Sequence, residues 1–198
     1  TGYAGITAQS RTEGISKTTG NVKSAGVIPF TMMKGDLGVT YANSVDVIES
    51  NLATAKANAS INLAAKDDTE LRYELNADTQ GGLAGTAGAA LTSKIDRSNI
   101  VTVGQKSSLF SSRDANLYAG RGIDPQTGER DLGAFRLSLI ADVTNRTGIP
   151  LHTDPSLSNV MTQNNMVRVA GGAKVESVRH ANLSAVTGDT QAYESAAK

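Results

Sequence analysis

Two histidines and a few acidic residues are the side chains whose types and spacing suggest catalysis. His152 lies two residues before Asp154, and a histidine held by a carboxylate can act as a general base in a hydrolase. The pair stands beside Pro155 in a polar stretch, where a loop histidine without a catalytic role is the commoner case. His180 is expected at the start of a strand, as a surface or hydrogen-bonded side chain. A hydrolase that uses His152 is therefore the least favoured function.

The sequence predicts no metal site, no phosphate site and no cofactor. Cysteine is absent, and the two histidines do not have the spacing of zinc ligands. Asp67, Asp68 and Glu70 could bind a hard cation, but the twelve-residue ligand series of an EF-hand is missing, so a solvated acidic corner is expected. The glycine-rich run 81–88 lacks the Gly-Lys-Ser/Thr ending of a phosphate loop. The Gly-x-Ser-x-Gly motif of serine hydrolases is also absent. We predict that the protein is not an enzyme.

Charge and composition favour self-association over binding to nucleic acid. The 198 residues include 19 basic and 19 acidic side chains, so the formal net charge is zero. Nucleic-acid domains usually carry a basic excess, because their affinity comes largely from phosphate neutralisation. Here Arg121 and Arg130 are offset by Asp124, Glu129 and Asp131, and no basic run is present. No apolar stretch is long enough for a transmembrane helix. A chain without net charge lacks one barrier to association with copies of itself.

Apolar residues at every second position are the main structural signal, and this period is typical of β-strands. The clearest run has Phe135, Leu137, Leu139, Ala141 and Val143 on one side. Shorter runs of the same kind occur along the chain, at residues 45–47, 61–65, 71–77, 101–103, 115–119, 167–169 and 181–185. Aromatic residues make up only 4%, so small aliphatic side chains must form the core. We predict an all-β fold.

Several segments are less regular. Residues 44–56 also fit one face of a helix, although strands are favoured. The glycine- and alanine-rich segment 83–91 is expected to be a flexible loop or a segment ordered only by close packing. Residues 121–134 are expected to form a loop or hairpin arm, because Asp124-Pro125 and Gly128 suit a turn. Residues 147–158 contain two prolines, which are unfavourable in a central strand, so a second loop is expected there.

The distribution of these signals divides the chain into two parts. Residues 1–26 are rich in Thr, Ser and Gly and contain few apolar residues, so we expect a flexible N-terminal arm or an arm that becomes ordered on a partner. Residues 27–198 carry the strand pattern and are expected to form a single β-rich domain.

A short phrase occurs three times: Asn, Leu, a variable position and Ala. Its Asn-Leu pairs are Asn62-Leu63, Asn116-Leu117 and Asn182-Leu183. Such a phrase fits one coil of a parallel β-helix, in which a short strand sends alternate aliphatic side chains inward. The next coil then stacks about 4.8 Å above it.

Ser50-Asn51-Leu52 and the run from Ala115 to Arg121, Ala-Asn-Leu-Tyr-Ala-Gly-Arg, resemble degenerate repeats of filamentous haemagglutinin-like exoproteins. This family includes the stalks of contact-dependent inhibition proteins. The resemblance covers about half of the chain and implies a parallel β-helix. Residues 121–134 and 145–160 do not fit a regular coil, and the phrases are unevenly spaced. A β-sandwich or jelly roll with extended loops would produce the same alternation and remains the second architecture.

These observations predict a non-catalytic structural protein. The expected role is a subunit or stalk segment of an extracellular filament, adhesin, pilus or virus-like shell, located outside the cell, at its surface or in a virion. Copies of the chain or neighbouring repeats are the expected partners, and they associate through strand edges and small aliphatic faces. Interface candidates are Phe135, Leu137, Leu139, Arg121 and Arg130. The alternative is a binding module that uses loops 121–134 and 147–158 for recognition.

Overall fold

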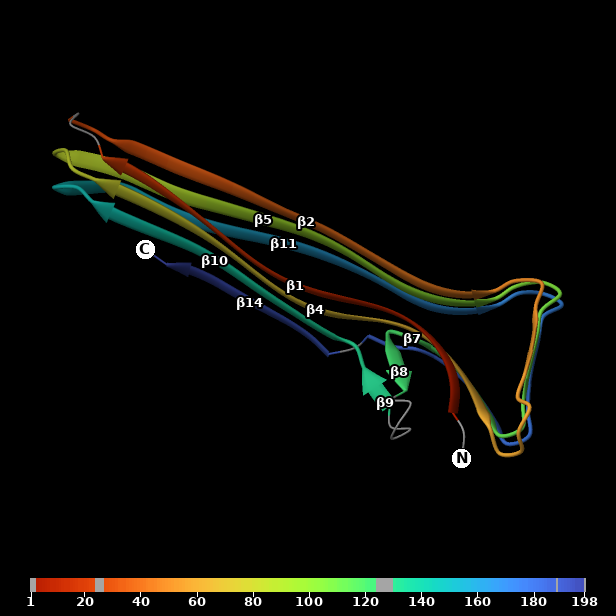
Figure 1. The fold of residues 1–198 in the computed structure, drawn as a ribbon. Helices are drawn as coiled ribbons and strands as arrows, with labels where there is room; N and C mark the ends of the chain where they lie inside the picture. The colour runs from red at the N-terminus through yellow and green to blue at the C-terminus, as the bar shows by residue number, and fades with distance from the viewer. Residues whose placement is uncertain (1–2, 24–26, 124–129, 188, 198) are drawn as a thin grey trace.

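The chain forms a long, narrow all-β molecule (Figure 1). The structure, a computed structural model, describes residues 3–23, 27–123, 130–187 and 189–197. Within these ranges every regular element is a β-strand. The predicted fold class, all-β, is confirmed.

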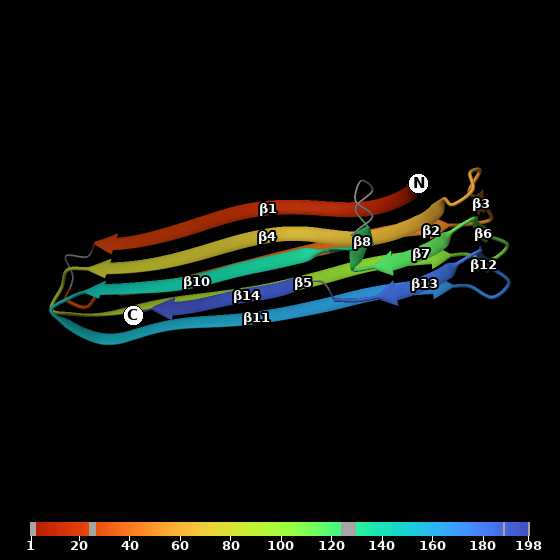
Figure 2. The same ribbon diagram turned by 90° about the horizontal axis from the view of Figure 1, so that it is seen from below.

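The largest sheet, sheet A, contains four parallel rows of strands. These are β1 (Tyr3–Lys23), β4 (Ser60–Gln80), a row made of β7 (Asp114–Ala119) and β10 (Ala134–Arg146), and a row made of β13 (His180–Ala185) and β14 (Asp189–Ala197). Each row pairs in parallel with the next. Figure 2 shows β1, β4, β10 and β14 lying side by side along the molecule.

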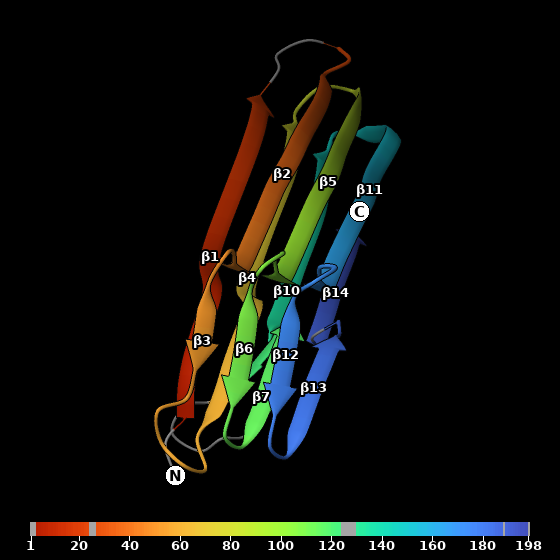
Figure 3. The ribbon, with the colours of Figure 1, turned by 90° about the vertical axis from the view of Figure 1, so that its right-hand side faces the viewer.

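Two further parallel sheets complete each passage of the chain. Sheet B contains β2 (Phe30–Val47), β5 (Ala84–Val103) and β11 (Ile149–Val169), and it lies opposite sheet A. The short sheet C contains β3 (Asn51–Ala53), β6 (Ser108–Ser111) and β12 (Lys174–Ser177), stacked at one end (Figure 3). The chain passes through sheets A, B and C in that order and then returns to sheet A one row further on. We call one such passage a turn.

Alternate side chains of sheets A and B point into the space between the two sheets and form the core. One cluster of buried residues includes Leu71, Leu75, Leu91 and Ile95 together with the alternating residues of β10. A second cluster, nearer sheet C, includes Leu63, Val101, Leu109 and Leu117. The predicted inward set from Phe135 to Val143 is confirmed, because those five apolar side chains are at most 3% exposed.

A buried polar layer lies between the two apolar clusters. Arg97 of β5 binds Asp67 of β4 across the interior, with Nε and Nη2 at 2.8 and 2.7 Å from Oδ2. Asn99 donates from Nδ2 to the other carboxylate oxygen at 2.7 Å, and the Arg97 guanidinium lies 4.3 Å from the centre of the Phe135 ring. The Asp67 and Arg97 side chains are only 2% and 1% exposed. The expected solvated acidic corner is therefore wrong for Asp67, because Arg97 compensates its charge inside the core.

Asparagine side chains connect successive turns in two columns. Inside the molecule, Asn43 donates to Asn99 at 2.9 Å, and Asn99 donates to Asn165 at 3.0 Å.

The second column lies on the other face of sheet A, where Asn116 donates to Asn62 at 2.7 Å and Asn182 donates to Asn116 at 2.8 Å. These three residues belong to the recurring phrase found in the sequence. The phrase therefore marks one position of three successive turns.

The predicted loop at residues 147–158 is wrong, because these residues fall largely within β11. Pro150 and Pro155 lie opposite Gly85 and Ala89 of β5. The N–H of Thr86 donates to the carbonyl of Pro29, on the side of β5 that faces β2. Because backbone N–H and C=O groups alternate between the two sides of a strand, those of Gly85 and Ala89 face β11. The backbone groups of the residues opposite them, Pro150 and Pro155, then face the open edge of the sheet. An N–H at these two positions would have no partner in the sheet, so proline is tolerated there.

Three other segments also form strands. Residues 84–91 belong to β5 rather than to a flexible loop, and Ala87, Ala89 and Leu91 are fully buried. Parallel pairing with β2 and β11 orders this segment as well as close packing, whereas the alternative prediction was order by close packing alone. Residues 44–56 contain the end of β2 and all of β3, so the helical alternative is wrong. The region expected as an N-terminal arm contains β1, which pairs with β4 over residues 3–23. The division into arm and domain stays a prediction.

The Asp67–Arg97 pair predicts a large asymmetry between single and double substitutions. Asp67→Ala should lower the free energy of unfolding by about 3–5 kcal/mol, because it leaves the Arg97 charge buried and uncompensated. The double variant Asp67→Leu with Arg97→Met should stay within about 1–2 kcal/mol of the parent, since no charge remains in the core. Urea denaturation measures both values.

As a control, Asp96→Ala removes the exposed partner of Lys94, whose ammonium lies 3.7 Å from the carboxylate. Its effect should stay below about 1 kcal/mol. Equal losses for Asp67→Ala and Asp96→Ala would contradict the role given to the buried pair.

Candidate functional site

The last turn leaves inward-facing side chains partly uncovered, and this open end is the most distinctive surface of the molecule. Leu63 and Leu117 are fully buried, whereas Leu183, the next residue in the same column, is 49% exposed. Val103 is fully buried, whereas Val169 beside it is 38% exposed. The inward positions of β11 are half-buried in the same way over Leu157, Asn159, Met161, Gln163, Asn165 and Val167.

The open end is stepped, because sheet A has one more row than sheet B. The row of β13 and β14 continues sheet A beyond β10 and β7, but no described strand pairs with the outer edge of β11. One edge of β11 therefore carries unpaired backbone N–H and C=O groups. Such an edge is a template for pairing with another extended chain.

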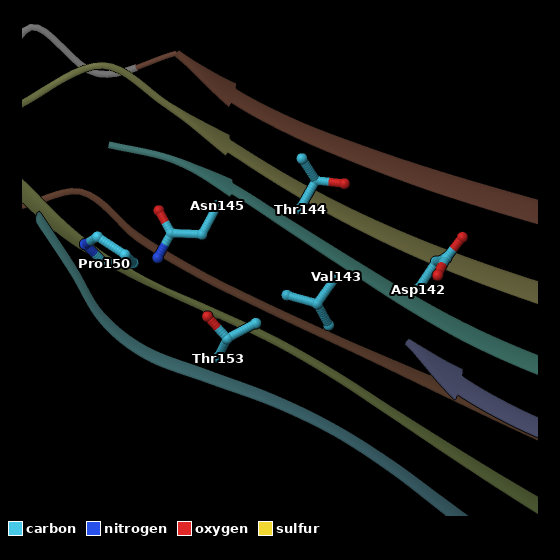
Figure 4. A pocket seen from close by; sticks show the side chains of 6 residues that line it. All are labelled: Asp142, Val143, Thr144, Asn145, Pro150 and Thr153. Carbon is cyan, nitrogen blue, oxygen red and sulfur yellow. The ribbon is translucent and has the colours of Figure 1, made fainter. Parts of the chain in front are cut away.

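A shallow cavity of about 420 Å³ opens at one end of this step, between β10 and β11 (Figure 4). It is lined by Asp142, Val143, Thr144, Asn145, Pro150 and Thr153. Asp142 is also the partner of Ala197 in the pairing between β10 and β14, so the cavity adjoins the row of β14. In Figure 4 the Val143 and Asn145 side chains from β10 point toward the strands of sheet B. The cavity is thus part of the open end and not a separate enclosed pocket.

A hairpin projects from sheet A between β7 and β10 (Figure 2). It consists of β8 (Arg121–Ile123) and β9 (Arg130–Leu132), which pair antiparallel. The hairpin arm expected in this region is confirmed by this pairing. The turn predicted from Asp124-Pro125 and Gly128 lies outside the described residues. The N–H of Gly133 points to the carbonyl of Gly120 at 3.4 Å, so the two ends of the insertion lie close together. A side chain at Gly133 would come within 2.5 Å of the Asp67 carbonyl oxygen.

The hairpin is attached to the outer face of sheet A by charged contacts. Lys66 binds Asp131 of β9, and its ammonium lies 3.2 Å from Asp68. Burial by itself lowers the pKa of Lys66, but the hydrogen bonds and charges of Asp131 and Asp68 outweigh it and raise the pKa above its ordinary value. Arg121 of β8 stacks on Tyr118, with 4.2 Å from the guanidinium to the ring centre. The arm is therefore held against the sheet at its base.

The residues predicted as interface candidates fall in two places. Phe135, Leu137 and Leu139 lie in the core of the chain itself, with exposed fractions of 0–2%. Arg121 and Arg130 lie in the hairpin, and the Arg130 side chain is outside the described part of the structure. Their role in contacts between copies stays a prediction.

The candidate catalytic pair is exposed. His152 Nε2 lies 3.8 Å from Asp154 Oδ2, and the two side chains are 66% and 61% accessible. His180 begins β13, as expected. Among the described residues, no group of three or more histidine, aspartate or glutamate side chains could hold a metal ion. Over the same residues, no helix has the length and apolarity to span a membrane.

One repeat in the sequence was missed, and it coincides with the inner asparagine column. Residues 43–47, 99–103 and 165–169 all read Asn-x-Val-x-Val, and they lie side by side in β2, β5 and β11. The linked residues are 56 and 66 positions apart. Comparison of the chain with itself at these unequal offsets could have revealed the motif. The Asp67–Arg97 pair belongs to no repeated motif, so such a comparison could not have identified it.

Comparison with known proteins found no matching family model, no matching curated protein and no matching solved structure. The function must therefore be argued from the geometry of this chain.

Leucine-to-alanine substitutions at Leu117 and Leu183, neighbours in one column, should lower the free energy of unfolding by different amounts. Leu117→Ala should lower the free energy of unfolding by about 2–5 kcal/mol, because it leaves a cavity in a closed core. Leu183→Ala should cost about 1 kcal/mol or less, since the side chain is already half exposed. Chemical denaturation of both variants at low protein concentration checks this difference, and equal losses would show that the last row is as enclosed as the third.

Proposed function

We propose that this protein is a non-catalytic structural segment of an elongated extracellular assembly, such as a filament, adhesin stalk, pilus or virus-like shell. The observation that carries the proposal is the stacking of successive turns in parallel register. In such an architecture each turn is the template for the next, so length is gained by adding further turns.

Parallel pairing favours a parallel β-helix over a sandwich or jelly roll. The three main sheets pair in parallel throughout, whereas sandwiches and jelly rolls are built from antiparallel strands. The stacked Asn-Leu phrases support the proposed parallel β-helix, since each phrase fits one coil, and that architecture is the one the resemblance to filamentous haemagglutinin-like stalks implies.

Association in this proposal uses two kinds of contact. Backbone groups along the edge of β11 form hydrogen bonds with a neighbouring strand, and each bond contributes roughly 0.5–1.5 kcal/mol. Half-buried side chains such as Leu157, Met161 and Val167 become enclosed, at about 25 cal/mol for each Å² removed from water. Only the surplus over the ordering cost appears as affinity, so a long edge is needed.

A binding module is the second candidate, and the attached hairpin is the observation that favours it. Of the two loops proposed for recognition, 121–134 contains the paired strands β8 and β9 of this projecting arm, whereas residues 147–158 largely belong to a strand. In this alternative the hairpin presents the recognition surface and the stacked turns position it.

Two lysine substitutions on β11 test association through the open end. Val167 points inward and is half-buried, whereas Val160 points outward and is 56% exposed. Val167→Lys should shift the concentration for self-association at least tenfold higher, because association would bury a charge. Val160→Lys should leave it within about twofold. Sedimentation velocity over a concentration series, with negative-stain microscopy, measures the effect.

Circular dichroism of both variants controls for folding. A parent chain that remains a compact monomer of 20.5 kDa at high concentration would count against assembly by this chain. Equal effects of the two substitutions would place the contact elsewhere.

A further inference from the structure

Exposed apolar side chains gather at one end of the long strands, in all three turns. There β1, β4 and β10 end and β2, β5 and β11 begin, at the left of Figure 1. We call this surface the apolar edge, and define it by six side chains that are 56–70% exposed: Val27, Ile28, Phe30, Leu83, Ile149 and Leu151. Leu83 is the most exposed of them, although it belongs to the middle turn and has a neighbouring turn on either side. Its exposure therefore does not arise from the first or the last turn.

The chain around the apolar edge carries no charged side chain. Residues 27–33, 79–93 and 147–151 contain no Asp, Glu, Lys or Arg. The first cations beyond these stretches include Lys34 of sheet B, which is exposed, and Arg146 of sheet A, whose side chain is 64% exposed and lies 3.9 Å from Asp78. An apolar surface with cations behind it is typical of protein segments that lie in a membrane interface.

The backbone of the apolar edge is hydrogen-bonded from one turn to the next. Leu83 donates its N–H to the Val27 carbonyl at 3.2 Å, and Gly148 donates to the Gly82 carbonyl at 3.3 Å. The loops are also tightly stacked, because a side chain at Gly148 would come within 2.9 Å of the Leu83 carbonyl oxygen. An unpaired backbone group is costly away from water, so this pairing lowers the cost of entering a lipid interface.

The dimensions of the apolar edge favour a lipid surface over a second copy of the chain. Adjacent turns lie about 4.8 Å apart, so the three stacked loops span roughly 10 Å. A stable protein interface uses about 20–30 residues from each partner, whereas the edge presents six large apolar side chains. A projecting edge of this kind needs no complementary groove to enter a fluid bilayer.

We propose that the apolar edge binds the surface of a phospholipid bilayer, with its aliphatic side chains among the acyl chains next to the headgroups. Arg146 ends β10 and Lys34 lies within β2, so both charges are placed behind the loops, at the level of the headgroup phosphates. Anionic headgroups therefore strengthen the binding. The lipid partner goes beyond the proposed structural function, because binding at this edge does not require the chain to assemble.

A single tryptophan reports on contact with lipid, because the chain has no tryptophan of its own. In Leu83→Trp, vesicles of phosphatidylcholine mixed with phosphatidylglycerol should shift the emission to shorter wavelength as the ring leaves water. Ile48→Trp is the matched control. Ile48 is 65% exposed but follows β2 at the opposite end of that strand, so the emission of this variant should not change.

Co-sedimentation with the same vesicles measures the contribution of the apolar edge. Leu83→Asp should weaken binding at least tenfold, because it replaces an apolar side chain with a charge that must stay in water. Ile48→Asp should bind within about twofold of the parent. The double variant Lys34→Gln with Arg146→Gln should bind the mixed vesicles at least threefold more weakly and pure phosphatidylcholine as the parent does. Circular dichroism verifies that each variant folds.

Absence of vesicle binding, equal emission shifts in the two tryptophan variants, or equal losses in the two aspartate variants would overturn the inference. Unchanged binding of the double variant would overturn the role of the two cations.

Sedimentation velocity without lipid separates this inference from the proposed function. If vesicles do not bind and Leu83→Asp instead prevents self-association, the edge is a contact between copies and only the lipid inference fails. If vesicles bind while the chain remains a monomer at high concentration, the lipid inference stands and the proposed assembly fails.

Discussion

The register between successive turns is the constraint on which the structure depends. In a strand the side chains alternate between the two faces, so a slip of one residue would move every inward side chain of that row to the outer face. Here such a slip would remove Arg97 from Asp67 and Asn99 from Asn43 and Asn165. Each misplaced group would lose its buried partner, and uncompensated burial costs more than the hydrogen bond contributes. The polar layer therefore specifies one alignment among many that aliphatic packing alone would allow.

The hairpin shows how this register tolerates an insertion. In β4, Ala65 pairs with Ala119 and Thr69 pairs with Phe135. Only three residues, Lys66 to Asp68, separate the two β4 residues, whereas their partners lie much further apart in the sequence. The additional residues leave sheet A at Gly120 and return at Gly133, and pairing with β4 then continues. Lys66 binds Asp131 in the second strand of the hairpin, and Asp68 accepts a hydrogen bond from the N–H of Ala134, where β10 begins. An arm is thus displayed without disturbing the columns on either side.

The sequence predicted much of the local structure, because period-two alternation follows directly from the geometry of a strand. The run from Phe135 to Val143 has the predicted orientation, and the recurrent Asn-Leu phrase marks stacked positions. The prolines at 150 and 155 led to the wrong prediction of a loop at residues 147–158. Their effect depends on whether the strand lies at the edge of its sheet, which is a property of the tertiary structure. Burial of Asp67 depends on Arg97 from a different sheet, so a local pattern could not reveal it.

The different exposure of the last row could also not be predicted from local sequence patterns. Leu117 and Leu183 occur in the same phrase, yet one is enclosed and the other is half exposed. Only the order of the rows decides which of them is covered. The order of the rows therefore supports the proposed function more than any single side chain does.

Paired spin labels on adjacent turns test the stacking most directly. Ser98 and Asn164 are directly opposite each other in β5 and β11 and point away from the core. The chain has no cysteine, so Ser98→Cys with Asn164→Cys places two labels on strands about 4.8 Å apart. Parallel stacking of β5 and β11 should give strong spin–spin broadening in the continuous-wave spectrum at high dilution of the protein. A spectrum equal to the sum of the two singly labelled variants would contradict the parallel stacking of turns.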